Sequence, residues 1–315
     1  MVTTRVAAID CGTNSIRLLI ADASGGKLRD VHRETRIVRL GQSVDATGVF
    51  APEAISRTRV ALTDYAALVQ TQHAERVRMV ATSAARDVAN RDDFFAMTAD
   101  VLGAVIPGSV AEVITGTDEA ALSFRGAVGE LSSAGAPFVV VDLGGGSTEI
   151  VLGDSAVVAS YSADIGCVRV TERFLRSDPP APDEVAAARR MVRERLVPAL
   201  RAVPVERGRT WVGLAGTMTT LSALAQDMTT YDAAAIHLSR VACAELVAVC
   251  DRLIAMTRAE RAALGPMHKG RADVIGGGAI VVQELARELG QRAGIDSLTV
   301  SEHDILDGIA LSIAG

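Results

Sequence analysis

Short apolar runs alternate with longer segments of mixed polarity along this chain, a pattern typical of alternating strands and helices. The clearest stretch is 139–152, where three valines, Asp142, three glycines and Ser147 precede a second apolar run. The β-branched residues predict a strand on each side of a glycine turn. Because glycine has no Cβ, the N–H groups of such a turn can approach a ligand, and concave rows of N–H groups bind phosphate.

The segment 6–21 repeats this hairpin. Placing Asp10 on Asp142 also places Gly12 on Gly144, Ser15 on Ser147 and Arg17 on Glu149. A lone glycine hairpin is common, but two copies with the same order of Asp, Gly and Ser are a much stronger signal. An internal repeat dictates architecture. The sequence therefore predicts two similar lobes, each with a phosphate-binding hairpin.

The remaining pattern completes an α/β protein with two domains. We expect domains at 1–130 plus about 301–315, and at 131–300. The first has strands at 6–10, 15–22, 28–40, 77–81 and 110–114, and helices at 53–72 after Pro52, 90–102, and 118–131 with Thr117 as N-cap. The second has strands at 138–152 (the hairpin), 156–161, 210–214 and 297–300, and helices near 168–175, at 184–200 broken by Pro198, from 215, at 240–256 capped by Ser239, at 273–289 and at 303–313.

Composition narrows the function. The chain has 315 residues, of which 49% are hydrophobic and only 3% aromatic, and its net charge is −6. Few aromatics and a negative charge argue against a nucleic-acid or membrane partner. Four cysteines without C-x-x-C spacing favour a reducing compartment. No apolar run approaches a membrane span, so we expect a cytoplasmic protein.

Further motifs make a family resemblance clear. D-C-G-T-N-S-I-R and D-L-G-G-G-S-T-E resemble the two phosphate loops of the actin-like ATPase superfamily. A-T-S-A-A-R-D at 81–87, I-T-G-T-D-E-A at 114–120 and G-R-A-D-V-I at 270–275 resemble the exopolyphosphatase and guanosine pentaphosphate phosphohydrolase family, in a short form without further helical domains. The resemblance implies two actin-like (ribonuclease H-like) lobes with an interdomain cleft, a final helix packed on the first lobe, and a homodimer.

Acidic residues in the hairpins point to a metal ion. Asp10, Asp142 and Glu149 do not suit a bare polyanion, but they fit an Mg²⁺ ion held between them and the phosphates, directly or through water. Asp also commonly closes a strand before a turn, and this is the alternative reading of Asp10 and Asp142.

The resemblance assigns the remaining roles. Glu119, the second acid of its motif, matches the family's catalytic base; from position alone, Asp118 and Glu119 only complement a helix dipole. Glu149 and Arg86 join it as catalytic candidates, and Arg86 follows a strand end, where sites of open α/β sheets lie. The phosphate-binding candidates are Asp10, Gly12, Thr13, Asn14, Ser15, Arg17, Ser83, Asp142, Gly144, Gly145, Gly146, Ser147, Gly216, Thr217, Lys269 and Arg271.

These assignments predict an Mg²⁺-dependent exopolyphosphatase that removes terminal phosphate from inorganic polyphosphate, with short chains preferred. Guanosine pentaphosphate is the alternative substrate that the same resemblance implies. Two other classes stay open: an actin-like small-molecule kinase, and a sensor that binds an alarmone or polyphosphate without turnover.

Overall fold

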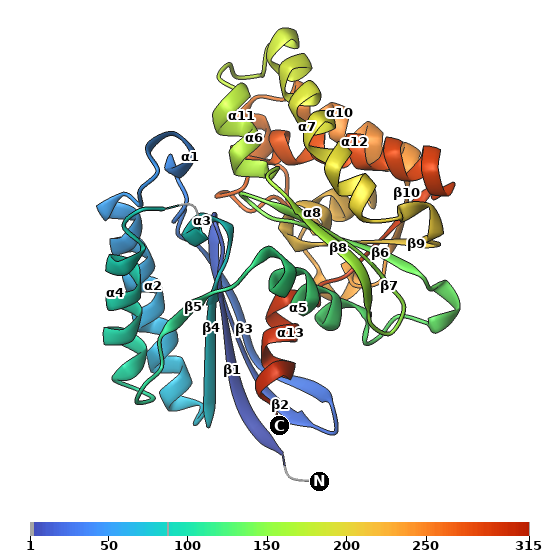
Figure 1. Cartoon of the computed structure of the whole chain (residues 1–315). Coiled ribbons are helices and arrows are strands. Elements are labelled where there is room, and N and C mark those ends of the chain that lie inside the picture. Colours follow the sequence, from blue (N-terminus) through green and yellow to red (C-terminus); the bar gives the residue numbers. More distant parts are fainter. Residues whose placement is uncertain (1–2, 87, 315) are drawn as a thin grey trace. The chain divides into compact units, whose positions relative to one another are not determined.

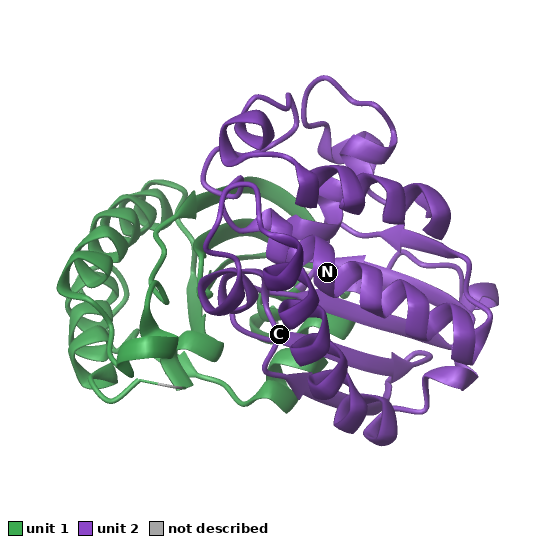
Figure 2. Ribbon diagram, turned by 90° about the horizontal axis from the view of Figure 1, so that it is seen from above, with its two compact units in different colours: residues 1–126, 305–315 green, residues 127–304 purple. Residues whose placement is uncertain are grey.

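The chain forms two compact α/β units, as the sequence predicts (Figure 1). The computed structural model describes residues 3–86 and 88–314. One unit comprises Met1–Gly126 with Ile305–Gly315, and the other comprises Ala127–Asp304 (Figure 2). The chain thus passes between units after residues 126 and 304, where the sequence suggested 130 and about 300.

The first unit is built on a five-stranded mixed sheet of order β3-β2-β1-β4-β5. β1 and β2 form an antiparallel hairpin in which Asp10 pairs with Arg17, while β4 runs parallel to β1 and β5 parallel to β4. The strands are β1 Thr4–Cys11, β2 Ser15–Ser24, β3 Lys27–Ile37, β4 Arg76–Ala81 and β5 Ala111–Val113.

Both faces of β1 and β2 are largely buried, which explains their near-continuous apolar runs, whereas β3 at the edge of the sheet is mostly charged and partly exposed. Ala7 and Ile9 of β1 belong to the core under α2 and α4, whereas Val6 and Ala8 belong to the core under α13. In α13, Gly308 permits a close approach, because a Cβ there would lie 2.0 Å from the Leu122 carbonyl oxygen of α5. The helices are α1 Val44–Thr47, α2 Pro52–Thr71, α3 Ser83–Arg86, α4 Arg91–Gly103, α5 Gly116–Val128 and α13 Ile305–Ile313.

The second unit repeats the plan on a six-stranded mixed sheet of order β10-β11-β9-β6-β7-β8. Here β6 and β7 form the antiparallel hairpin, in which Asp142 pairs with Glu149, and β9 runs parallel to β6. The pairing therefore confirms the predicted alignment of the two hairpins. The strands are β6 Phe138–Leu143, β7 Thr148–Gly153, β8 Val157–Ala163, β9 Thr210–Leu214, β10 Arg240–Ala242 and β11 Ser297–Val300.

A long, largely buried helix organises the helical layer of the second unit. This helix, α12, contacts α6, α7 and α10. Three consecutive glycines in its first turn let neighbours approach, since a Cβ on Gly277 would lie 2.5 Å from Thr171 Oγ1 and one on Gly278 2.7 Å from Thr217 Cγ2. The helices are α6 Cys167–Phe174, α7 Pro182–Ala202, α8 Ala215–Ala225, α9 Ala233–Ile236, α10 Cys243–Ala255, α11 Arg258–Ala262 and α12 Ile275–Ala293, with 3₁₀ turns at Ser133–Gly135 and Val205–Arg207.

Three local predictions are wrong. α7 continues through the exposed Pro198 to Ala202, because proline near the last turn removes one N–H without ending the helix. Ser239 caps no helix, since the residues after it form β10, which pairs with β11. Thr117 lies inside α5 instead of capping it.

Across the described residues, no helix combines the length and the apolar character that crossing a bilayer requires.

Candidate functional site

The candidate residues of the first unit gather at one edge of its sheet. β1, β4 and β5 are parallel to one another, so their carboxyl ends meet at the same edge. β1 leads into the glycine corner at 12–15, β4 into Ser83 and Arg86 of α3, and β5 into Glu119 of α5. The last residue of the motif at 81–87, Asp87, lies outside the described residues.

Glu119 and Arg86 form an ion pair at this edge. Nη1 of Arg86 donates to Oε2 of Glu119 at 2.7 Å and to the carbonyl oxygen of Ile114 at 3.1 Å. The Glu119 side chain is 10% exposed. The second contact ties the guanidinium to the end of β5, so Arg86 can hold the carboxylate in one orientation. Charge-assisted hydrogen bonds of this kind are stronger than neutral ones.

The neighbouring acid, Asp118, has a different task. Its Oδ2 accepts the hydroxyl of Thr115 at 2.7 Å and the N–H of Thr115 at 3.3 Å, while the N–H of Asp118 donates to Thr115 Oγ1 at 3.1 Å. This reciprocal arrangement is a capping box at the start of α5. Thr115 is therefore the N-cap that the sequence placed at Thr117. The T-x-x-D spacing at 115–118 was the signal for it.

The first corner offers backbone donors beside an ion pair. Among the described residues, no protein acceptor is bonded to the N–H groups of Thr13 or Asn14, whereas Gly12 N–H closes the turn onto Ser15 O at 2.9 Å. Arg17 donates from Nε and Nη2 to Oδ2 of Asp10, at 2.9 and 2.7 Å. Asp10 and Arg17 are thus engaged with each other, a contact that opposes metal binding by Asp10.

The second glycine corner, at 144–147, has the same turn but carries two acidic side chains where the first has an acid and an arginine. Gly144 N–H donates to Ser147 O at 3.0 Å, and the described residues provide no acceptor for the N–H groups of Gly145, Gly146 and Ser147. Asp142 and Glu149 are cross-strand partners, 7% and 1% exposed. Directly opposed side chains of an antiparallel pair share one face of the sheet. Two buried carboxylates there fit a hard cation with oxygen ligands, and Ser162 Oγ orients Glu149 by donating to Oε1 at 2.7 Å.

A third loop joins this corner through Cys167. α8 begins directly after β9 with Ala215 in the left-handed region, at φ 67°, an energetically costly backbone conformation of the sort found at functional sites. The guanidinium of Arg271 covers Gly216, where a Cβ would lie 1.9 Å from Nη2, and its Nη1 donates to Thr220 Oγ1 at 2.8 Å.

Cys167 contacts both the second corner and the loop that contains Thr217. Its N–H donates to Gly144 O at 3.0 Å. Burial raises the pKa of its thiol to about 11, although Arg271 and a hydrogen bond with Thr217 lower it. The thiol is therefore protonated at neutral pH and serves packing. The second unit thus brings its corner, Thr217 and Arg271 together, while Lys269 stays exposed on the adjoining loop.

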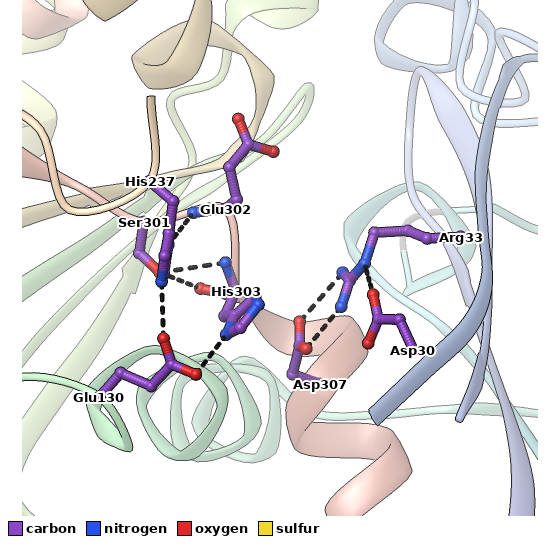
Figure 3. Close-up of polar contacts among 8 residues, drawn as sticks. All are labelled: Asp30, Arg33, Glu130, His237, Ser301, Glu302, His303 and Asp307. Carbon is purple, nitrogen blue, oxygen red and sulfur yellow. Dashed lines mark hydrogen bonds and ion pairs between the residues drawn. The ribbon is translucent and has the colours of Figure 1, made fainter. Parts of the chain in front are cut away.

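One cluster away from the glycine corners has the composition of a metal site. Ligand atoms of Glu130, His237 and His303 lie within 4.8 Å of one another (Figure 3). However, Nδ1 of His237 accepts the N–H of Glu302 at 3.2 Å, so the proton of the neutral ring is on Nε2, which faces Oε2 of Glu130 at 2.8 Å. A metal would need the lone pair of that Nε2. The contacts therefore indicate a hydrogen-bonded cluster and do not fit a metal centre.

The chain is similar in sequence to known phosphatases. The model of the Ppx/GppA phosphatase family matches residues 19–313. Exopolyphosphatase 2 of Mycobacterium tuberculosis is 80% identical over 319 aligned positions, which cover 100% of both chains. A bifunctional 3-dehydroquinate synthase/phosphatase of Fusobacterium nucleatum is 31% identical over 318 positions, covering 97% of this chain and 46% of that protein.

Solved structures agree with these matches. An exopolyphosphatase-like protein superposes with a TM-score of 0.95 at 41% identity, covering 99% of this chain and 98% of that one. The Aquifex aeolicus PPX-GPPA enzyme gives a TM-score of 0.79 at 32% identity, covering 99% and 100%. The predicted fold of two actin-like lobes is confirmed by these neighbours. The chain is accordingly an enzyme that belongs to the Ppx/GppA phosphatase family.

Proposed function

We propose that this enzyme is an exopolyphosphatase that hydrolyses the terminal phosphoanhydride bond of inorganic polyphosphate. The observation that carries the proposal is the Arg86–Glu119 pair at the same sheet edge as the first corner, whose Thr13 and Asn14 N–H groups have no bonded acceptor among the described residues. The 80% identical relative is named an exopolyphosphatase, which favours polyphosphate over guanosine pentaphosphate as the substrate. Guanosine pentaphosphate is kept as the alternative.

In the proposed reaction Glu119 is the general base. Arg86 fixes its carboxylate, which accepts a proton from a water molecule as the water oxygen bonds to the terminal phosphorus. The anhydride P–O bond to the rest of the chain breaks, and the shortened chain leaves with that oxygen. The corner N–H groups donate hydrogen bonds to the phosphate oxygens and so stabilise the charge that develops there.

We propose Mg²⁺ as the cofactor of this enzyme. Asp142 and Glu149 would hold it, since they are two buried carboxylates on one face of a hairpin. The ion would add positive charge next to the phosphate oxygens and so lower the cost of placing a polyanion beside acidic residues. Asp10 is a weaker candidate ligand because Arg17 already occupies its Oδ2.

The test compares phosphate release from polyphosphate, guanosine pentaphosphate and ATP, with and without Mg²⁺. We expect Glu119→Gln to lower kcat on polyphosphate by about 10²–10⁴-fold, the usual contribution of a general base. Tripolyphosphate binding, followed by titration calorimetry, should be retained. The matched control is Glu194→Gln, an exposed acid on α7, which should behave like the wild type. A Glu119→Gln protein that keeps more than a tenth of the rate would contradict the assignment.

The same assay distinguishes a phosphohydrolase from the two other functional classes, a kinase and a sensor. A kinase would transfer phosphate to an added alcohol or acid with no reaction in water alone, and a sensor would bind polyphosphate and release nothing. A series of defined chain lengths tests the preference for short chains, which equal or faster hydrolysis of very long chains would contradict.

We also propose that the enzyme is a cytoplasmic homodimer. A homodimer is expected from the family resemblance, and light scattering after size-exclusion chromatography would measure it. A cytoplasmic location agrees with the four cysteines, all of which are free thiols.

A further inference from the structure

The glycine corners are held from behind by the segment that follows the third strand of each unit. In the first unit, Val38 and Arg39 donate their N–H groups to Asn14 O at 3.1 and 2.8 Å, and Gly41 donates to Thr13 O at 2.8 Å. The contact is tight, since a Cβ on Gly41 would lie 2.4 Å from Thr13 Cγ2. Every donor in this support is a backbone group.

The second unit repeats the support at the start of α6. Cys167 N–H donates to Gly144 O at 3.0 Å, and Val168 N–H donates to Gly145 O at 2.9 Å. Gly166 again allows a close approach, because its Cβ would lie 2.3 Å from Gly145 O. The third carbonyl differs from the first unit: Gly146 O accepts a side chain, Nε of Arg169, at 2.8 Å.

These contacts fix the direction of the corner N–H groups, because each peptide unit is planar. In a trans peptide unit the carbonyl of one residue and the N–H of the next point in opposite directions. Holding the carbonyls of Gly144 and Gly145 behind the turn therefore directs the N–H groups of Gly145 and Gly146 forward. By the same geometry, the Gly146 carbonyl that Arg169 holds determines the direction of the Ser147 N–H.

We propose that Arg169 is a positioning residue that aims the Ser147 N–H at a substrate phosphate. The inference rests on the proposed function, because it assumes that the corner binds phosphate. In the first corner, the described residues hold Thr13 O and Asn14 O through backbone N–H groups, whereas Gly146 O accepts the Arg169 side chain. The second corner can therefore be loosened by one side-chain substitution.

Two variants of Arg169 separate the effect of its hydrogen bond to Gly146 O from the effect of its positive charge. Arg169→Met removes both the Nε–H donor and the positive charge, whereas Arg169→Lys keeps the charge but has no donor at the Nε position. If Arg169 positions the corner, both variants should raise the Kd for tripolyphosphate and the KM for polyphosphate about fivefold to tenfold, the contribution of one hydrogen bond. Both should leave kcat within about twofold. The control is Arg195→Met, an exposed arginine of α7, which should change neither value.

Three results would overturn the proposal. Wild-type affinity in Arg169→Lys together with weak binding in Arg169→Met would make Arg169 an electrostatic attractor. A lower kcat at unchanged KM and Kd would indicate a merely structural loss, and wild-type values in both variants would remove the role. Failure of the proposed function is a separate result: a wild-type protein that releases no phosphate ends the exopolyphosphatase assignment, while the calorimetric comparison still decides on Arg169.

Discussion

Two adjacent acids at the start of α5 have different partners and therefore different roles. Asp118 is bonded to Thr115 in the capping box, while Glu119 is bonded to Arg86. A helix start needs only one capping acid, so the second is available for chemistry. The Thr115–Asp118 pair also fixes the first turn of α5, and with it the position of Glu119. Asp118 therefore supports both the helix and the position of Glu119, while the Glu119 carboxylate carries the proposed catalysis.

Arg86 should matter for the rate through Glu119. Arg86→Met removes the donor to Glu119 Oε2, a charge-assisted bond whose loss is worth about 10- to 100-fold. We expect kcat on polyphosphate to fall by that factor, with a smaller change in KM. Steady-state phosphate release measures both. Arg91→Met, at an exposed position of α4, is the control and should leave them unchanged. An Arg86→Met enzyme with full kcat would show that Glu119 needs no orienting partner.

At this scale the sequence predicts the residues whose spacing recurs or matches a motif. The two corners and Glu119 are in that class. Arg169 and Thr115 were missed for a physical reason: each acts on a backbone group whose orientation exists only in the folded chain. Asp10 and Arg17 are paired because they lie opposite each other in the hairpin. The alignment of the two hairpins implies this register, but it does not show that the two side chains bond to each other.

Among the elements, α7 and α12 are joined by a charge network around the buried carboxylate of Glu284. The Glu284 side chain, 2% exposed, accepts Nε and Nη2 of Arg193 at 2.8 and 3.0 Å and Nε of Arg287 at 3.1 Å. Burial raises the pKa of Glu284, but the two guanidinium groups outweigh it and hold that pKa below 4.5. The network fastens two helices that the apolar pattern alone would only bring close.

The pH dependence of this network has a definite sign. A depressed carboxyl pKa adds stability above the unfolded-state value and loses it as the pH falls through the folded-state value. We expect Glu284→Gln to lower the free energy of unfolding at pH 7 by about 1–3 kcal/mol. The gap from the wild type should narrow as the pH falls below 4.5. Urea unfolding followed through Trp211, which is fully buried in the second unit, reports it. A gap that stays constant down to pH 3 would contradict this account, and Glu194→Gln is again the control.

The order and type of most elements follow from periodicity, and the differences have local causes. The hairpins, α2 after Pro52, and the strand–helix alternation are confirmed. Missed elements are very short, such as α1, α3 and α9 at four residues each, because one helical turn carries no period to detect. The sequence pattern extends α10 over the strand β10, because its three residues join the sheet through tertiary pairing with β11, which local periodicity does not reveal.

On the scale of the whole chain, the first unit is discontinuous in sequence. α13 buries Ile305 and Ile309 against Val6 and Leu19, which lie on the opposite face of the sheet from α2. Arg33 of β3 also donates to both carboxylate oxygens of Asp307, at 3.1 and 2.6 Å (Figure 3). Burial lowers the pKa of Arg33, but Asp307 and Asp30 raise it above its usual range. Apolar contact and an ion pair thus hold the same helix.

Removing residues 305–315 should damage the first unit selectively. The sheet face under α13 would be exposed to water, at about 25 cal/mol for each Å² of apolar surface. We expect new protease cleavage sites within residues 3–126, mapped by mass spectrometry, while Trp211 fluorescence stays native. Asp307→Asn, which keeps the helix and removes the charge, should show a milder form of the same pattern. Loss of the Trp211 signal together with the first unit would contradict the independence of the two cores.

The return of α13 to the first unit also bears on synthesis. A ribosome completes the entire second unit before it makes α13, so the nascent first unit waits with one face of its sheet uncovered. The first unit can therefore bury that face only after residues 127–304 have been made. Completion of its core thus depends on a segment that the entire second unit separates from the other residues of that core.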